Sequence, residues 1–304
     1  MDFFLVCFSL TFHISIKIFK NWIIQMPQNS NHLKLAEEIL FYFKKLDFVE
    51  AVILGGSLTG KIIDHHSDID LYVYSDQRVP PEFRKDVVQN LGASEANIGL
   101  TFWDDGDEWF HKKSGIEIDM IYWDKKWIED QLENLLIKHK ASIGYSTCFW
   151  HTILNSKILF DRSGWFSQLQ SKSKIPFPQH LKEAIITKNY PLLRNIIPSY
   201  YNQINKAIDR NDIVSINHRI AAFFASYFDI IFALNEIPHP GEKKILPFVQ
   251  NNCLKIPHSM SENIRDILNN SGDLLPNLDE LINNLNALLK QEGFSPEEFS
   301  WKNL

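Results

Sequence analysis

The sequence predicts an α+β protein, with a small mixed β-sheet in its first half and an all-helical second half. Short apolar runs next to glycines or alternating with polar residues indicate strands at 51–54, 69–74 and 115–123. Beyond Asp124 the apolar residues recur at helical spacing instead. These two periods, in that order along the chain, place strands and helices in separate halves.

The first half opens with a helix expected from residue 31 to about residue 45. Ser30 or Asn31 can cap its start. Its apolar side chains lie three or four residues apart, as one buried stripe requires: Ala36, Ile39, Leu40 and Phe43. The run 51–54 follows as a buried strand, so this helix is expected to pack against the sheet.

A second helix is predicted after the strand at 69–74. Pro80 and Pro81 suit its first turn, and Gly92 suits its end. Alternation over 98–102 then predicts a further strand. The acidic stretch 104–108 is expected to be a solvated turn that leads into the strand at 115–123.

The turn between the first two strands carries the first functional signal. Gly55 and Gly56 allow a tight turn and a close approach of the backbone to a ligand. Ser57 follows, where backbone N–H groups at a helix start could face an anion. Along the next strand Asp68 and Asp70 share one face, since side chains alternate. Two carboxylates that repel each other would be stabilised by a bound cation.

A third carboxylate is expected to join this pair. In the strand at 115–123, Glu117 and Asp119 share a face opposite Ile116, Ile118 and Met120. If this strand lies beside the strand at 69–74, Asp119 can reach the cation held by Asp68 and Asp70. Carboxylate oxygens favour Mg²⁺, which takes its other ligands from water and substrate phosphates. The pattern therefore predicts a site for a nucleoside triphosphate.

These motifs resemble the polymerase-beta-like nucleotidyltransferase superfamily. The resemblance covers residues 50–125, through Gly56-Ser57, the motif Ser67-Asp68-Ile69-Asp70-Leu71, and Asp119 on a later strand. The form of the second motif is most similar to the small bacterial branch that includes the aminoglycoside and lincosamide nucleotidyltransferases. The order strand, turn, helix and strands also matches the minimal catalytic fold of that superfamily.

The resemblance implies a Mg²⁺-dependent transfer of a nucleoside monophosphate, expected from ATP, to a hydroxyl of a small acceptor such as an antibiotic. Asp68, Asp70 and Asp119 would be the catalytic and metal-binding residues, expected to hold two ions. Asp119 or Glu117 would be the base. The nucleotide would contact four further residues: Gly56, Ser57, Ser67 and Lys243.

Two alternatives from the same resemblance stay open. One is a protein adenylyltransferase of the toxin–antitoxin kind, and the other is a nucleotide-binding protein without turnover. The added helical half favours a small-molecule acceptor over a protein side chain, because the relatives that modify proteins tend to be short single domains. The retention of all three carboxylates favours turnover over binding alone.

Composition bounds the protein class. The 304 residues carry a net charge of −6, which argues against a dedicated nucleic-acid binder with a basic face. Three cysteines, Cys7, Cys148 and Cys253, show neither metal spacing nor a disulfide pattern and are expected to be small buried apolar residues. A cytoplasmic location is expected. The oligomeric state stays open.

Residues 1–25 form an apolar extension with His13, Lys17 and Lys20 inside it. The extension lacks the basic start and cleavage site of a signal peptide, and its uninterrupted apolar part is too short for a secure membrane span. Three interpretations remain: a packing helix, a peripheral membrane anchor, or a translation start placed too early. Stable membrane insertion is not expected.

The catalytic domain is expected over 26–170 and the helical domain over 171–304. Long helices are predicted at 192–209 and 213–235, and the second is apolar nearly all round, as in the core of a bundle. Shorter helices are expected near 261–270 and 278–291.

Overall fold

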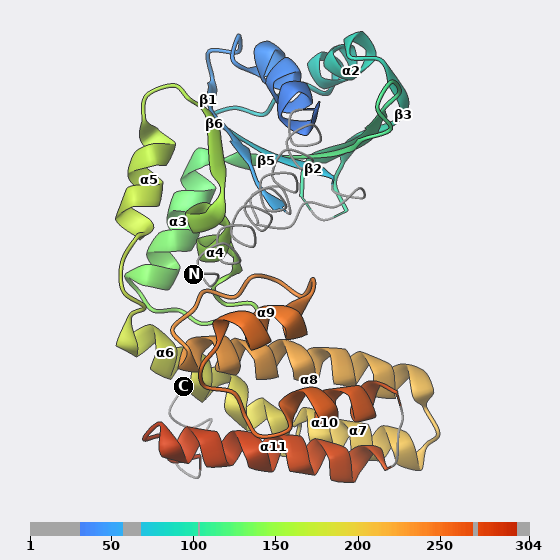
Figure 1. Cartoon of the computed structure of the whole chain (residues 1–304), viewed down its shortest axis with the longest axis vertical. Helices are drawn as coiled ribbons and strands as arrows, with labels where there is room; N and C mark the ends of the chain where they lie inside the picture. The colour runs from blue at the N-terminus through green and yellow to red at the C-terminus, as the bar shows by residue number, and fades with distance from the viewer. Residues whose placement is uncertain (1–30, 57–67, 103, 270–272, 297–304) are drawn as a thin grey trace, which may run out of the picture. The chain divides into compact units, whose positions relative to one another are not determined.

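The computed structural model describes residues 31–56, 68–102, 104–269 and 273–296 (Figure 1). The chain divides into two compact units. Unit 1 comprises Met1–Ile128 and Asn155–Leu169, and unit 2 comprises Glu129–Leu154 and Gln170–Leu304. Residues 129–154, which the sequence assigned to the catalytic domain, thus belong to unit 2. The chain leaves unit 1, enters unit 2, and returns to unit 1 before its final passage through unit 2.

Unit 1 is built on a six-stranded mixed sheet, which confirms the predicted α+β class. The strand order is β3-β4-β5-β2-β1-β6, and among the described strand pairs only β2–β5 is parallel. The strands are β1 (Val49–Leu54), β2 (Ile69–Ser75), β3 (Ala93–Leu100), β4 (Gly106–His111), β5 (Glu117–Asp124) and β6 (Lys157–Asp161). The strand at 115–123 was expected beside the strand at 69–74, and β5 does lie beside β2.

One face of this sheet packs against two helices. The helix over residues 31–43 and α2 (Pro81–Asn90) lie on the same side of the sheet in Figure 1. The sheet contributes one alternating set of side chains to their shared core: Val52, Leu54, Ile69, Leu71, Val73, Ile118 and Met120. Because side chains alternate along a strand, the intervening residues of β2 and β5 point to the opposite face.

The acidic stretch 104–108 was expected to be a solvated turn, which fits the exposed Asp104 and Glu108 but was wrong for the residues between them. Gly106 begins β4, and Asp107 is 1% exposed. Arg84 of α2, also fully buried, forms two hydrogen bonds of 2.7 Å to Asp105 and lies 3.4 Å from Asp107. The Tyr122 hydroxyl donates to Asp107 at 2.6 Å. These partners stabilise the carboxylates of the buried Asp107 and the partly exposed Asp105. The residues next to the acidic stretch in the sequence do not predict these partners.

Unit 2 is helical. Two of the described helices have four or more residues on each side of the unit boundary, α3 (Lys125–Leu136) and α5 (Trp165–Ser173). The others are α4 (Cys148–Asn155), α6 (Gln179–Tyr190), α7 (Tyr200–Asp209), α8 (Ile213–Leu234), α9 (Ile245–Asn252), α10 (Met260–Leu268) and α11 (Leu274–Gln291). The helix α8 packs against α6 and α7 and buries Phe223, Tyr227 and Ile230, as expected for the core of a bundle.

The single helix expected at 192–209 is divided. A π-helical turn over Pro191–Asn195 continues α6, and α7 begins only at Tyr200. Pro198 lies in the break, where a proline restricts the preceding residue to extended backbone. Ser199 then caps α7 by accepting a hydrogen bond from the Asn202 N–H. Pro198 thus lies at a helix boundary inside the apolar pattern that predicted one continuous helix.

Asp229, on α8, is buried at the centre of a polar network in unit 2. Its carboxylate accepts hydrogen bonds from the Ser146 N–H (3.0 Å), the Ser146 hydroxyl (2.7 Å) and the Asn189 amide (3.2 Å). Asn189 also accepts from the Gly144 N–H at 2.9 Å. Burial raises the pKa of Asp229 to about 7, although these hydrogen bonds oppose the rise. The network fixes the connection between α3 and α4 onto α8.

The two cysteines among the described residues differ. Cys253 is buried, as expected, whereas Cys148 is half-buried with its sulfur 3.6 Å from His239 Nδ1. Burial raises the pKa of Cys148 to about 12, so its thiol stays protonated. Cys7 lies outside the described residues, as does the 1–25 extension. Within the described ranges, no helix has both the length and the apolar character needed to cross a bilayer.

Candidate active site

Asp70 and Asp119 face each other across the parallel strand pair. In the β2–β5 register, Asp70 lies opposite Asp119, between the pairs Ile69–Ile118 and Leu71–Met120. The flanking residues are buried in the core, so alternation directs both aspartates to the other face. Both carboxylates are half-buried. The juxtaposition of these two residues, predicted from the sequence, is therefore present in the fold.

The Gly55-Gly56 turn lies directly against this acidic face. The Gly55 N–H donates to the Asp70 carbonyl at 2.9 Å. Gly56 has φ +59°, and a Cβ placed there would lie 1.6 Å from Asp70 Oδ2. A Cβ at Gly55 would lie 2.2 Å from Cε2 of Tyr72. The glycines were expected to admit a ligand, and the structure shows that they admit the side chains of Asp70 and Tyr72.

The pKa of Tyr72 is affected by all three acidic side chains. Tyr72 follows Asp70 on the same face of β2, and its pKa is raised, first by burial and then by the negative charges of Asp70, Asp119 and Asp68. Asp68 precedes β2 and is half-buried, whereas Glu117 at the start of β5 is exposed. The charges of all three predicted aspartates therefore raise the pKa of the same phenol.

The same face continues into a set of stacked aromatic rings. The Tyr72 and Trp123 rings stack with centroids 4.8 Å apart and planes within 10° of parallel. Trp127, from the first turn of α3, lies 5.5 Å from Trp123 by the same measure. Alternation along β2 puts Tyr72 and Tyr74 on this face, but nothing in the sequence indicates that the two strands would stack their rings.

Carboxylate oxygens in this arrangement suit a hard cation. Mg²⁺ usually binds through one or two carboxylates and completes its coordination with water and substrate phosphates. The facing Asp70 and Asp119 match that donor set. Over the described ranges, no group of three or more His, Cys, Asp and Glu side chains has the spacing of a metal site. The chain thus supplies a carboxylate pair with Asp68 nearby, and no closed cage is formed within those ranges.

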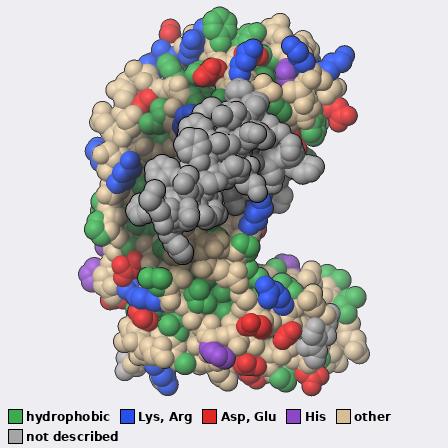
Figure 2. Space-filling view, viewed as in Figure 1, with side chains coloured by type: hydrophobic (Ala, Val, Ile, Leu, Met, Phe, Trp, Pro, Cys, Tyr) green, Lys and Arg blue, Asp and Glu red, His purple; other side chains and the backbone are tan. Residues whose placement is uncertain are grey.

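The other predicted nucleotide contacts, Ser57, Ser67 and Lys243, stay predictions. Ser57 and Ser67 lie outside the described residues. Lys243 belongs to unit 2, where it is exposed in the turn before α9. In the view of Figure 2, basic and acidic side chains are interspersed over the surface and do not gather into one basic patch.

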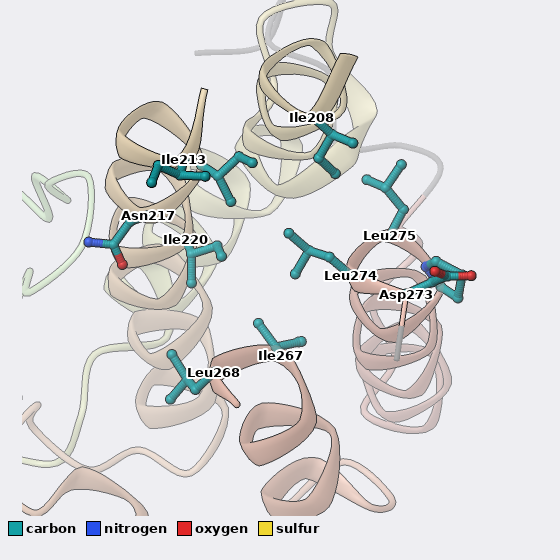
Figure 3. Close-up of a pocket in the computed structure, with 11 residues that line it drawn as sticks. Ile208, Ile213, Asn217, Ile220, Ile267, Leu268, Asp273, Leu274 and Leu275 are labelled. Carbon is teal, nitrogen blue, oxygen red and sulfur yellow. The ribbon is translucent and has the colours of Figure 1, made fainter. Parts of the chain in front are cut away.

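A separate pocket lies within unit 2, among the ends of α7, α8, α10 and α11. It has a volume of about 600 Å³. Figure 3 shows the aliphatic side chains of Ile213, Ile220, Ile267 and Leu274 around it, while the Asn217 amide points away. Asp273 is its one ionisable lining residue, so the pocket offers an apolar surface and no set of reactive groups.

Eighteen chains among the solved structures match this one, and they include the following two. A nucleotidyltransferase-like protein from Exiguobacterium sibiricum 255-15 matches with a TM-score of 0.42 and 9% identity, over 85% of this chain and 74% of that one. A STING-associated CdnE c-di-GMP synthase from Capnocytophaga granulosa matches with a TM-score of 0.25 and 13% identity, over 88% and 82% respectively. No family model and no curated protein matches the sequence. Both TM-scores and both sequence identities are low, so neither match identifies the function of this chain.

Proposed function

We propose that this chain is a Mg²⁺-dependent nucleotidyltransferase that moves a nucleoside monophosphate from a triphosphate, with ATP as the first candidate, to an acceptor hydroxyl. The observation that carries the proposal is the register of β2 and β5, which places Asp70 opposite Asp119 with Asp68 beside them. Two facing carboxylates next to a glycine turn suit metal-assisted phosphoryl chemistry, because carboxylate oxygens are the ligands by which Mg²⁺ is held beside substrate phosphates.

Each acidic residue has a distinct task in this proposal. Asp68 and Asp70 would hold the cation that accompanies the β- and γ-phosphates, and Asp119 would complete the binding of a second one. Bound Mg²⁺ would supply neutralisation of the leaving pyrophosphate and activation of the acceptor hydroxyl. Asp119 would also accept the hydroxyl proton, with Glu117 as the alternative base.

The glycine turn would help to hold the triphosphate. Backbone N–H groups at Gly56 and Ser57, with the hydroxyls of Ser57 and Ser67, would bind phosphate oxygens. Lys243 would add a positive charge to the same triphosphate. The acceptor would be a small molecule such as an antibiotic, because a helical unit accompanies the sheet. The relatives in the resembled superfamily that modify protein side chains tend to be short single domains.

The test is a screen of four nucleoside triphosphates against a panel of hydroxyl-bearing small molecules, read out as pyrophosphate release. We expect release with at least one pair in the presence of Mg²⁺. Omission of Mg²⁺ or the change Asp70→Asn should abolish it. Labelled nucleotide incubated with cell lysate would show whether the label enters protein instead. Pyrophosphate release that Asp70→Asn leaves unchanged would overturn the assignment.

A further inference from the structure

Tyr72 has its ring held on two sides next to the acidic face. One side stacks on Trp123, with ring centroids 4.8 Å apart and planes within 10° of parallel. The edge that carries Cε2 lies over Gly55, where any Cβ would come within 2.2 Å of it. A ring confined in this way has little freedom to turn, so the direction of its hydroxyl is set before any ligand binds.

The environment of this hydroxyl suits a hydrogen-bond donor. A tyrosine phenol keeps its proton at neutral pH, because its ordinary pKa is about 10. A group that the acidic site binds together with a cation must itself be rich in negative oxygen. A fixed and protonated hydroxyl beside Asp70 and Asp119 would therefore meet acceptor atoms on such a ligand, and hydrogen bonds to charged acceptors are the stronger kind.

The neighbouring Tyr74 shows that the environment is particular to Tyr72. Tyr74 follows on the same face of β2, but it is completely buried among Trp123, Trp165 and Phe166. Its hydroxyl has no hydrogen-bond partner among the described residues. Tyr72, by contrast, is only half-buried. Tyr74 thus has no surface that a ligand could contact, whereas Tyr72 keeps part of its surface exposed.

We propose that Tyr72 is a phosphate-binding residue, whose hydroxyl donates a hydrogen bond to a non-bridging phosphoryl oxygen of the nucleotide held at Asp68, Asp70 and Asp119. The inference rests on the proposed function, and it adds a contact that the glycine-serine turn does not provide. Tyr72 takes no part in proton transfer in this scheme. It orients the triphosphate through a donor that the fold has already placed.

The experiment compares Tyr72→Phe with Tyr74→Phe, because both remove one hydroxyl and keep the ring. Binding is measured by calorimetry with Mg²⁺ and the four α,β-methylene nucleoside triphosphates, of which the tightest is used for the variants. We expect Tyr72→Phe to raise Kd about tenfold, the effect of one hydrogen bond to a charged acceptor. Tyr74→Phe should leave Kd unchanged. Terbium luminescence, titrated without nucleotide, should give the same metal affinity for all three proteins.

Each other outcome overturns the inference in a recognisable way. If the wild-type protein binds a Mg²⁺–nucleotide analogue and Tyr72→Phe binds it equally well, the inference fails while the proposed function stands. If terbium affinity falls as much as nucleotide affinity in Tyr72→Phe, the hydroxyl acts on the carboxylates and not on the phosphate. If the wild-type protein binds none of the four analogues, both proposals fail together.

Discussion

Asp70 and Asp119 are 49 positions apart in the sequence, yet they lie directly opposite each other on a parallel strand pair, the only one among the described strands. Parallel pairing with this register is what puts both on one face, because a shift of one residue would send one of them into the core. Ile118 and Met120, both buried, prevent that shift. The apolar side of the two strands thereby determines the geometry of the acidic side.

The first prediction separates the two candidate bases on β5. Asp119→Asn should lower the rate of nucleotide transfer by about 10²–10³-fold or more, because a charge-stabilising group is lost from the site. Glu117→Gln, two residues earlier and exposed, should change the rate little. Single-turnover transfer with the acceptor found in the screen measures both. A large loss in Glu117→Gln with a small one in Asp119→Asn would exchange their roles.

The second prediction concerns Gly56. Gly56→Ala should destabilise unit 1 by about 2–4 kcal/mol, since the new Cβ would overlap the Asp70 carboxylate and the backbone has a positive φ. Gly92→Ala is the matched control, because its φ is also positive (+77°) but nothing lies within 4 Å of the new Cβ. It should cost about 1–2 kcal/mol. Urea unfolding followed by hydrogen exchange of sheet amides compares them, and equal losses would show that Asp70 does not occupy this space.

The third prediction concerns the ion pairs that the buried Arg84 forms with Asp105 and Asp107. Arg84→Met should destabilise unit 1 by about 3–5 kcal/mol, because Asp107 would stay buried without its cation and the partly exposed Asp105 would keep only Arg78. Arg78→Met removes an exposed partner of the same Asp105 and should cost about 0–1 kcal/mol. The same unfolding measurement applies to both. Comparable losses would mean that the buried arginine is not what holds these carboxylates.

The fourth prediction follows from Asp229. Its pKa is raised to about 7 in the folded protein from an unfolded value of 3.8. Between these two pH values the folded protein keeps a proton on Asp229 that the unfolded chain releases. This group therefore contributes stability that is present below about pH 4 and is lost as pH rises towards 7. The free energy of unfolding of unit 2 should fall by about 2–4 kcal/mol over that range through this group. Asp229→Asn should remove that part of the pH dependence.

The measurement for Asp229 is the difference between the two proteins at matched pH, since other groups also titrate over this range. Urea unfolding of unit 2, followed by exchange of α8 amides, gives the free energies. If the slope with pH is the same in both proteins, Asp229 does not bind the proton inside the fold.

Much of unit 1 could be predicted because its signals are local. Alternation in 69–74 and 115–123 fixed which residues share a face, and the buried apolar set left only the other face for Asp68, Asp70 and Asp119. Caps and prolines were equally local. The start of α2 after Pro80 and the hydrogen bond from the Trp127 N–H to Asp124 before α3 follow the expected pattern.

The features that the sequence concealed depend on distant partners. The stretch 104–108 looked like a solvated turn because its partner, Arg84, lies about twenty residues earlier on a helix. The stacking of Tyr72 on Trp123 likewise arises only when β2 and β5 pair. The membership of residues 129–154 in unit 2 is a third such feature, since hydrophobic periodicity says that a segment is helical without saying which unit it joins.

The placement of β6 at the edge of the sheet constrains how the protein can be shortened. β6 (Lys157–Asp161) covers the outer edge of β1, yet it is separated from the rest of unit 1 by a segment of unit 2. A truncation after Ile128 would leave the backbone N–H and C=O groups along that edge of β1 free to recruit strands from other molecules. An isolated catalytic fragment should therefore be produced with residues 155–169 rejoined to residue 128 through a flexible linker, so that aggregation is avoided.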